Sequence, residues 1–219
     1  MLQTITLAIT ISFLANSDAF GGHRSHTIPS KTYRNSLLCM NSERLKLIAG
    51  NWKMNTDLRS ALVLTDELIH LTSSVDPASV EVAVIPPYPF LRDVSKVIQD
   101  SRGKLSISVG AQLSSGESKG AFTGAVSASM LKSVGAKYIL AGHSERRTIF
   151  GEDDNLVNLS LLSILKEKLK PILCVGETKE EYELGLGEEV CTVQLSRGLK
   201  GVAVKDLTKV VIAYEPIWF

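Results

Sequence analysis

The stretch Tyr138-Ile139-Leu140-Ala141-Gly142-His143-Ser144-Glu145-Arg146-Arg147 joins an apolar run to a polar turn and then to a helix-like segment. The run 138–141 is continuously apolar, which is typical of a strand buried on both faces of a parallel sheet. Ser144 is a residue type that caps helices, and we expect Glu145 and Arg146 to begin one. The stretch predicts a strand, a turn that carries a histidine, and a helix.

Two other polar motifs also follow apolar, strand-like runs. They are Gly50-Asn51-Trp52-Lys53-Met54-Asn55 and Tyr214-Glu215-Pro216-Ile217-Trp218. The side chains of Lys53, His143 and Glu215 can converge only if their strands are parallel and close around one axis. In a barrel of alternating strands and helices, functional groups gather at the carboxyl ends of the strands.

Strand-like and helix-like segments alternate from Leu45 to the last residue. Repeated βα units form either an open doubly wound sheet or a closed barrel. No Gly-x-Gly-x-x-Gly motif follows the first of these strands, which argues against a dinucleotide-binding fold. We therefore expect an α/β protein of the (β/α)8-barrel class with about six βα units. The expected strands are 45–49, 80–85, 105–109, 138–141, 171–175 and 210–213, and the expected helices are 57–71, 90–98, 127–134, 155–169, 180–184 and 188–199.

The bulk composition is that of one globular domain. The chain has 219 residues, 44% of them hydrophobic, and a formal net charge of +1. Such a balance argues against a surface dedicated to nucleic acid or to anionic membranes. Cys39, Cys174 and Cys191 are odd in number and lack CxxC spacing, so we expect neither a disulfide framework nor a zinc site.

The first 44 residues have the composition of targeting segments. Residues 5–14 are mostly apolar, and the small residues Ser17 and Ala19 precede a predicted cut before Phe20. Residues 20–44 are basic and rich in hydroxyl groups, with no acidic residue before position 43. We expect a signal peptide at 1–19, a transit-peptide-like segment at 20–44 and the barrel domain at 45–219. This arrangement is similar to the bipartite presequence of complex plastids; a plain secretory signal, or a disordered tail on a cytoplasmic protein, is the alternative.

The three motifs carry residue types suited to acid–base chemistry on an anion. Lys53 can attract an anionic ligand and stabilise charge that develops on oxygen, and Asn51 can donate a hydrogen bond to the same ligand. A helix N-terminus disfavours imidazolium, so His143 should be a neutral donor. Glu215 in a partly dry pocket should gain basicity and take a proton from carbon. Taken singly, each of these residues is better explained by a structural role, such as a salt bridge or a capping contact, and only the three motifs together favour a functional site.

From Leu45 onward the chain resembles the triosephosphate isomerase family. The matching stretches are 49–55, Gly120-Ala121-Phe122-Thr123-Gly124, 140–147, Ile172-Leu173-Cys174-Val175-Gly176-Glu177 and 213–218. The resemblance implies a TIM barrel that interconverts dihydroxyacetone phosphate and D-glyceraldehyde 3-phosphate through an enediolate. It implies a role in glycolysis, gluconeogenesis or the Calvin cycle, with no metal or organic cofactor.

The resemblance also implies a role for each site residue. Glu215 would be the catalytic base, His143 the neutral electrophile, and Lys53 and Asn51 the substrate-binding groups. Ser144 and Glu145 would support them.

Several departures from the family pattern concern the barrel and the dimer. Family members continue with a Gly-rich lid and two further βα units, so we expect an incomplete barrel with 210–213 as an edge strand and 45–49 short of one partner. Family members also form homodimers through the loop that holds Thr123. Here Ala125 and Leu113 replace the usual Glu and Asn, which weakens the expected polar contact with the neighbour's Arg146. The alternatives are a catalytically inactive fragment that binds a partner and, less favoured, another phosphosugar barrel enzyme.

Overall fold

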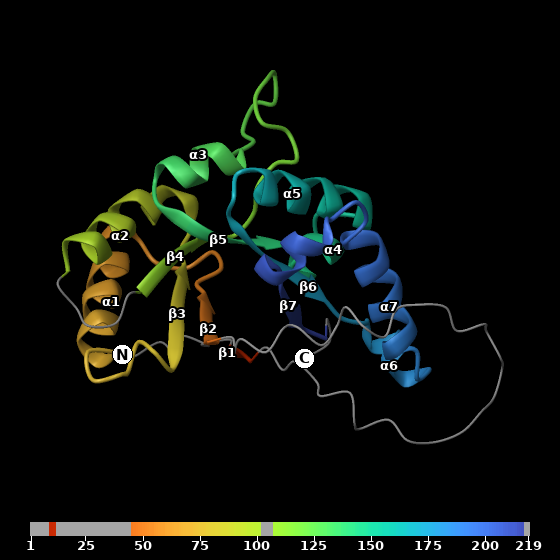
Figure 1. The fold of residues 1–219 in the computed structure, drawn as a ribbon, viewed down its shortest axis with the longest axis horizontal. Helices are drawn as coiled ribbons and strands as arrows, with labels where there is room; N and C mark the ends of the chain where they lie inside the picture. Colours follow the sequence, from red (N-terminus) through yellow and green to blue (C-terminus); the bar gives the residue numbers. More distant parts are fainter. Residues whose placement is uncertain (1–8, 12–44, 102–106, 217–219) are drawn as a thin grey trace.

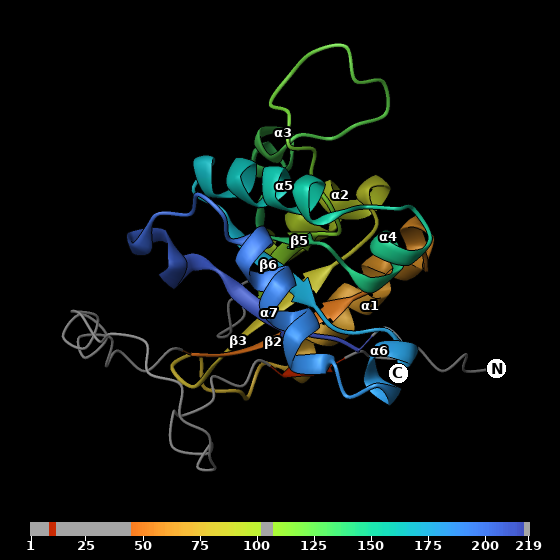
Figure 2. The same cartoon turned by 90° about the vertical axis from the view of Figure 1, so that its right-hand side faces the viewer.

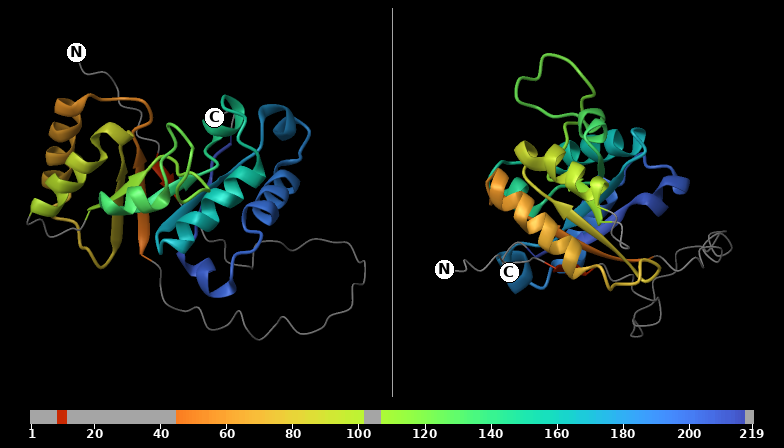
Figure 3. Two further views of the ribbon diagram at one scale, coloured as in Figure 1. Left: turned by 90° about the horizontal axis from the view of Figure 1, so that it is seen from above. Right: turned by 90° about the vertical axis from the view of Figure 1, so that its left-hand side faces the viewer.

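The computed structural model describes residues 9–11, 45–101 and 107–216. In this part of the chain, six parallel strands pair in chain order and form a curled sheet, as Figures 1 and 3 show. The sheet is the α/β half-barrel that the alternating pattern predicts. The parallel strands are β2 (Lys46–Asn51), β3 (Val80–Ile85), β4 (Ile107–Ala111), β5 (Ala136–Ala141), β6 (Lys170–Val175) and β7 (Val211–Tyr214).

A seventh strand, β1 (Ile9–Ile11), pairs antiparallel with β2. The strand β2 therefore has a neighbour on each side, which corrects the expectation that it would lack one. This neighbour comes from within the predicted signal peptide. The rest of that peptide, its predicted cut and the predicted transit segment 20–44 lie outside the described residues.

Helices cover the convex face of the sheet (Figure 2). Most begin and end within a few residues of the predicted positions, and local capping explains several of the boundaries. Asp57, for example, forms a capping box with Ser60 at the start of the first helix, in the reciprocal arrangement that satisfies two free N–H groups. None of the helices in the described ranges is long and apolar enough to cross a membrane. The helices are α1 (Leu58–Leu71), α2 (Tyr88–Asp100), α3 (Ala128–Ser133), α4 (Ser144–Thr148), α5 (Asp154–Lys166), α6 (Lys179–Glu183), α7 (Gly187–Gly198) and the 3-10 helix η2 (Val204–Lys209).

Both faces of the inner strands β4, β5 and β6 are largely buried. On β6, Leu173 and Val175 pack outward against the helices, whereas Ile172 and Cys174 point into the concave side of the sheet. This alternation places two apolar layers on one strand, which is why the strand sequences are continuously apolar.

The carboxyl ends of the parallel strands lie along one edge of the sheet. The pairing of Asn51 with Ile85, and of Val175 with Tyr214, fixes the height of the residues that follow each strand. The loop between β4 and α3 projects away from the helices on the side of α3 (Figures 1 and 2). The described parts of the three polar motifs, which are residues 50–55, 142–147 and 214–216, therefore lie at the carboxyl edge, as predicted.

Candidate active site

Lys53 follows β2 in a left-handed backbone conformation, with φ of 53°. For a residue with a side chain this conformation costs roughly 1–2 kcal/mol. Its N–H donates to Asn51 Oδ1 at 3.0 Å, and its carbonyl accepts from Gln112 Nε2 at 2.7 Å. The side chain then reaches Glu145, with Nζ 3.0 Å from Oε1. The Oδ1 atom of Asn51 thus holds the lysine in place, and its amide nitrogen is the group that can donate to a ligand.

His143 is nearly buried, with 6% of its surface exposed. It is the N-cap of α4, and its Nδ1 accepts a hydrogen bond from the Glu145 N–H at 3.2 Å. The prediction that Ser144 caps this helix is wrong, because the imidazole nitrogen takes the place of a hydroxyl and Ser144 becomes the first helical residue. A ring nitrogen that accepts carries no proton, so the ring proton lies on Nε2.

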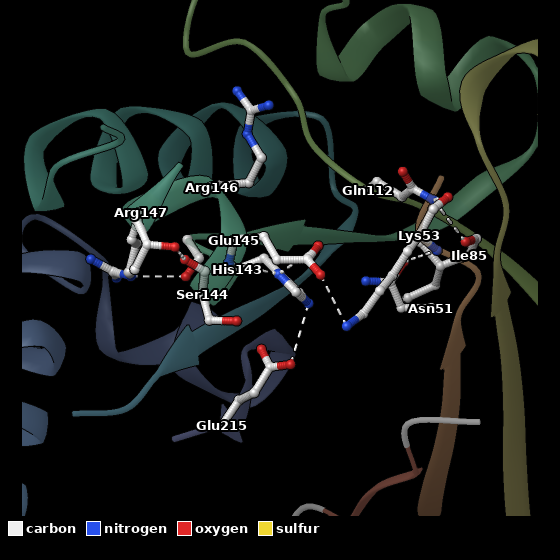
Figure 4. A network of polar contacts seen from close by, with 12 residues as sticks. Asn51, Lys53, Ile85, Gln112, His143, Ser144, Glu145, Arg146, Arg147 and Glu215 are labelled. Carbon is white, nitrogen blue, oxygen red and sulfur yellow. Dashed lines mark hydrogen bonds and ion pairs between the residues drawn. The ribbon is translucent and has the colours of Figure 1, made fainter. Parts of the chain in front are cut away.

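The proton on Nε2 faces Glu215, whose Oε1 lies 3.3 Å away (Figure 4). Burial raises the pKa of the Glu215 carboxyl. The hydrogen bond and the electrostatic interaction with His143, the charge of Lys53 and the backbone N–H of Ser144 together outweigh burial, so this pKa lies below its ordinary value. The expected gain in basicity is therefore wrong for the free site, since these partners stabilise the carboxylate.

Glu145 contacts the lysine, and its carboxylate lies beside the histidine. Its Oε1 contacts Lys53 Nζ, and its Oε2 lies 3.6 Å from His143 Nδ1. Figure 4 shows Lys53 to the right of Glu145 and His143, and Glu215 below His143. Side chains from β2, β5 and β7 thus meet as the sequence predicts.

The space beside these residues is small. A cavity of about 30 Å³ is lined by Asn51, His143, Cys174 and Glu215. A substrate oxygen that accepts the Nε2–H of His143 would compete with Glu215 for that proton.

Thr123 lies in the loop between β4 and α3, outside the network of Figure 4. Arg146, which we expected to face a neighbouring chain, donates to Glu152 Oε1 from Nε at 2.9 Å and from Nη2 at 2.7 Å. Its guanidinium also lies 4.1 Å from the centre of the Phe150 ring. Arg146 therefore has partners within its own chain.

Two residues of the site were not predicted. Gln112 donates to the carbonyls of Lys53 and Ile85, and Arg147 donates to the carbonyls of Gly142 and Cys174. Gln112 directly follows β4, and that strand-end position was the available signal. Among residues 9–11, 45–101 and 107–216, no group of three or more His, Cys, Asp or Glu side chains could hold a metal ion.

The fold and this site define a (β/α)-barrel protein with an acid–base pair and a cation at the carboxyl edge of its sheet. The family model of triosephosphate isomerase matches residues 46–219. The chain is 49% identical over 175 residues to the triosephosphate isomerase of Thermoanaerobacter sp. (strain X514), a match that covers 80% of this chain and 68% of the relative. It is 44% identical over 175 residues to that of Carboxydothermus hydrogenoformans, covering 80% and 67%.

A solved structure supports the same assignment. The crystal structure of triosephosphate isomerase from Bartonella henselae superposes with a TM-score of 0.70 at 32% identity, over 79% of this chain and 68% of that one. The chain belongs to the triosephosphate isomerase family, and so to the enzymes that isomerise triose phosphates.

Proposed function

We propose that this chain interconverts dihydroxyacetone phosphate and D-glyceraldehyde 3-phosphate through an enediolate. The observation that carries the proposal is the 3.3 Å contact between His143 Nε2 and Glu215 Oε1, on a ring whose Nδ1 accepts from a backbone N–H. It brings a base next to a neutral proton donor. Triosephosphate isomerase is itself the standard example of this pairing.

Glu215 takes a proton from the carbon beside the substrate carbonyl. The electron pair of that C–H bond becomes the new carbon–carbon double bond, and the carbonyl pair moves onto oxygen. The Nε2–H of His143 donates to this oxygen, and Lys53 stabilises the charge on it. His143 gives its Nε2 proton to the former carbonyl oxygen and takes the proton of the neighbouring hydroxyl in its place. Glu215 then returns the carbon-bound proton to the former carbonyl carbon, which completes the exchange of carbonyl and hydroxyl.

Substrate binding changes the basicity of Glu215. In the free site its pKa is lowered chiefly by the His143 hydrogen bond, against burial. A substrate that takes over the Nε2–H of His143 removes this contribution, and burial remains. The carboxylate therefore becomes a stronger base when the substrate is in place.

A homodimer and plastid targeting are part of the proposal. Met54, next to Lys53, is 97% exposed, and Phe122, next to Thr123, is about half exposed. Two apolar side chains so placed support a contact in which the loop of one copy covers the lysine motif of the other. The basic, hydroxyl-rich composition of 20–44 supports plastid import.

The test is isomerase turnover of the purified chain, in both directions, beside two variants. Glu215→Gln removes the base, and we expect kcat to fall by about 10²–10⁴-fold. The matched control is Glu183→Gln on α6, an exposed glutamate in an i,i+4 pair with Lys179, which should keep the parent rate. Absence of turnover in the parent chain, or full turnover in Glu215→Gln, would overturn the proposal.

A further inference from the structure

We propose that Arg147 is a positioning residue for the reaction: its guanidinium joins the ends of β5 and β6 and so sets the separation of His143 from Glu215. The inference rests on the proposed function. Arg147 makes three directed contacts from a side chain that is 12% exposed. Its Nε–H donates to Gly142 O at 2.8 Å, Nη2 to Cys174 O at 3.3 Å and Nη1 to Asp154 Oδ1 at 2.7 Å.

The two carbonyls lie just beyond the last paired residues of the two strands. The register of β5 with β6 ends at Ala141 and Leu173. Gly142 and Cys174 are the next residues, and Arg147 binds the carbonyl of each. The guanidinium thus continues the cross-strand connection for one more residue, at the level where the site begins.

Gly142 is one residue from a reacting group, and Cys174 is one residue and one hydrogen bond from the other. Gly142 directly precedes His143, and its φ of 73° turns the chain toward the site. Cys174 directly precedes Val175, whose carbonyl accepts the Glu215 N–H at 2.8 Å. A shift between the two carbonyls therefore becomes a shift between the imidazole and the carboxylate.

The fit between Arg147 and Gly142 is close. A Cβ atom on Gly142 would lie 2.7 Å from Arg147 Nη2, a separation at which one of the two must move. Only a planar guanidinium donates in three fixed directions at once, since a lysine ammonium is a single point charge. Lysine at this position would keep the charge beside Asp154 and lose the paired hydrogen bonds to the carbonyls of Gly142 and Cys174.

Arg147 lies on the opposite side of His143 from Lys53 in Figure 4. Its described contacts are to Gly142, Cys174 and Asp154, so it acts through the backbone rather than on the substrate. Arg197 provides a matched control, because its Nη1 lies 3.5 Å from Asp154 Oδ2 and its side chain is 67% exposed. It contacts the same carboxylate and has no described bond to either carbonyl.

The kinetic test compares Arg147→Lys, Arg147→Met and Arg197→Met with the parent chain. We expect both Arg147 variants to lose about 10²-fold in kcat, the cost of a misplacement near 1 Å, with KM changed less than about threefold. Arg197→Met should stay within about twofold of the parent. Recovery of the parent kcat in Arg147→Lys would overturn the proposal, because charge alone would then be sufficient.

A second readout does not require turnover. Nitrogen NMR of the ring of His143, assigned with His143→Gln, should show an unprotonated Nδ1 and a protonated Nε2 in the parent and in Arg197→Met. In the Arg147 variants the Nε2–H resonance should shift, because the imidazole and the Glu215 carboxylate move apart and the hydrogen bond between them weakens. If Arg147→Met does not fold, Arg147→Lys carries the same comparison.

The two readouts separate the two proposals. A parent chain without turnover overturns the proposed function. The NMR measurement on the ring of His143 then still tests the role of Arg147. An unchanged Nε2–H resonance in folded Arg147 variants overturns the positioning role, whatever the parent rate.

Discussion

The two ends of the sheet each hold a carboxylate, and the two are bound differently. At the amino ends of the strands, Glu81 accepts hydrogen bonds from Ser108 at 2.9 Å, from Tyr138 at 2.7 Å and from Lys137. Lys170 lies 3.4 Å away. Burial raises the pKa of Glu81, but these donors lower it to about 2. Donors from three neighbouring strands thus fix the charge of this carboxylate.

At the carboxyl ends, the side chain of Glu215 has His143 as its closest described ion-pair partner. A single imidazole can be exchanged for a substrate, whereas several donors on neighbouring strands cannot be replaced together. A carboxylate on or beside a barrel strand is therefore structural when its partners belong to the sheet itself. It becomes reactive when its main partner is itself a group that serves the ligand.

The largest effect is expected where the exchangeable partner is removed. His143→Gln deletes the imidazole that donates to the substrate oxygen, and we expect kcat to fall by about 10²–10⁴-fold. The control is His70→Gln, because His70 lies exposed on α1 beside Asp66. Steady-state kinetics of the two variants, with circular dichroism to check folding, decide the comparison. Equal rates in both would show that His143 is only a capping residue.

Glu81, whose partners are fixed in the sheet, should contribute to stability rather than to turnover. Glu81→Gln leaves a neutral group among two lysines and a tyrosine, and we expect the free energy of unfolding to fall by about 1–3 kcal/mol. Turnover of the folded fraction should stay near the parent value. Urea unfolding and kinetics on the same sample measure both quantities. A loss of kcat without a loss of stability would contradict the assignment of Glu81 as structural and Glu215 as reactive.

A fall in pH should destabilise the fold through the protonation of Glu81. A carboxylate whose folded pKa is lowered from 4.5 to about 2 stabilises the fold above pH 4.5, and this contribution is lost as the pH falls toward 2. The free energy of unfolding should therefore drop more steeply between pH 4.5 and 2 in the parent than in Glu81→Gln. Parallel curves for the two proteins would show that Glu81 is not held as described.

The smallest effect is expected from Lys170→Met. Its ammonium lies 3.4 Å from Glu81 Oε2, and its side chain is 38% exposed, so solvent weakens the pair. Such a pair contributes less than about 1 kcal/mol. Urea unfolding should place this variant between the parent and Glu81→Gln. A loss as large as that of Glu81→Gln would mean that Lys170 holds the carboxylate as firmly as the hydrogen-bond donors do.

Much of the fold was predictable, because continuous apolar runs and helical spacing reflect burial that each segment carries in its own residues. The convergence of Lys53, His143 and Glu215 was predictable for a related reason: parallel strands end on one edge. The cap of α4 was not, since an imidazole nitrogen took the place that a serine hydroxyl usually fills. The capping preference of a residue type does not show which way a neighbouring histidine ring points.

Contacts between segments far apart in the sequence could not be predicted from the spacing of apolar residues. Gln112 binds the carbonyl of Lys53 across 59 positions of the chain, and Arg147 binds that of Cys174 across 27. The lowered pKa of Glu215 depends on such contacts too, because burial alone would raise it. Sequence spacing indicates which residues share an edge. It does not give the partner of each polar atom on that edge.

The left-handed backbone of Lys53 makes the site sensitive to changes that leave its charges intact. The described restraints on that conformation are the oxygen of Asn51 and the amide of Gln112, both neutral groups. Loss of either would let the lysine relax to an ordinary conformation and carry its ammonium away from Glu145. A neutral substitution would then resemble a charge deletion in its effect on anion binding, although the net charge of the protein would be unchanged.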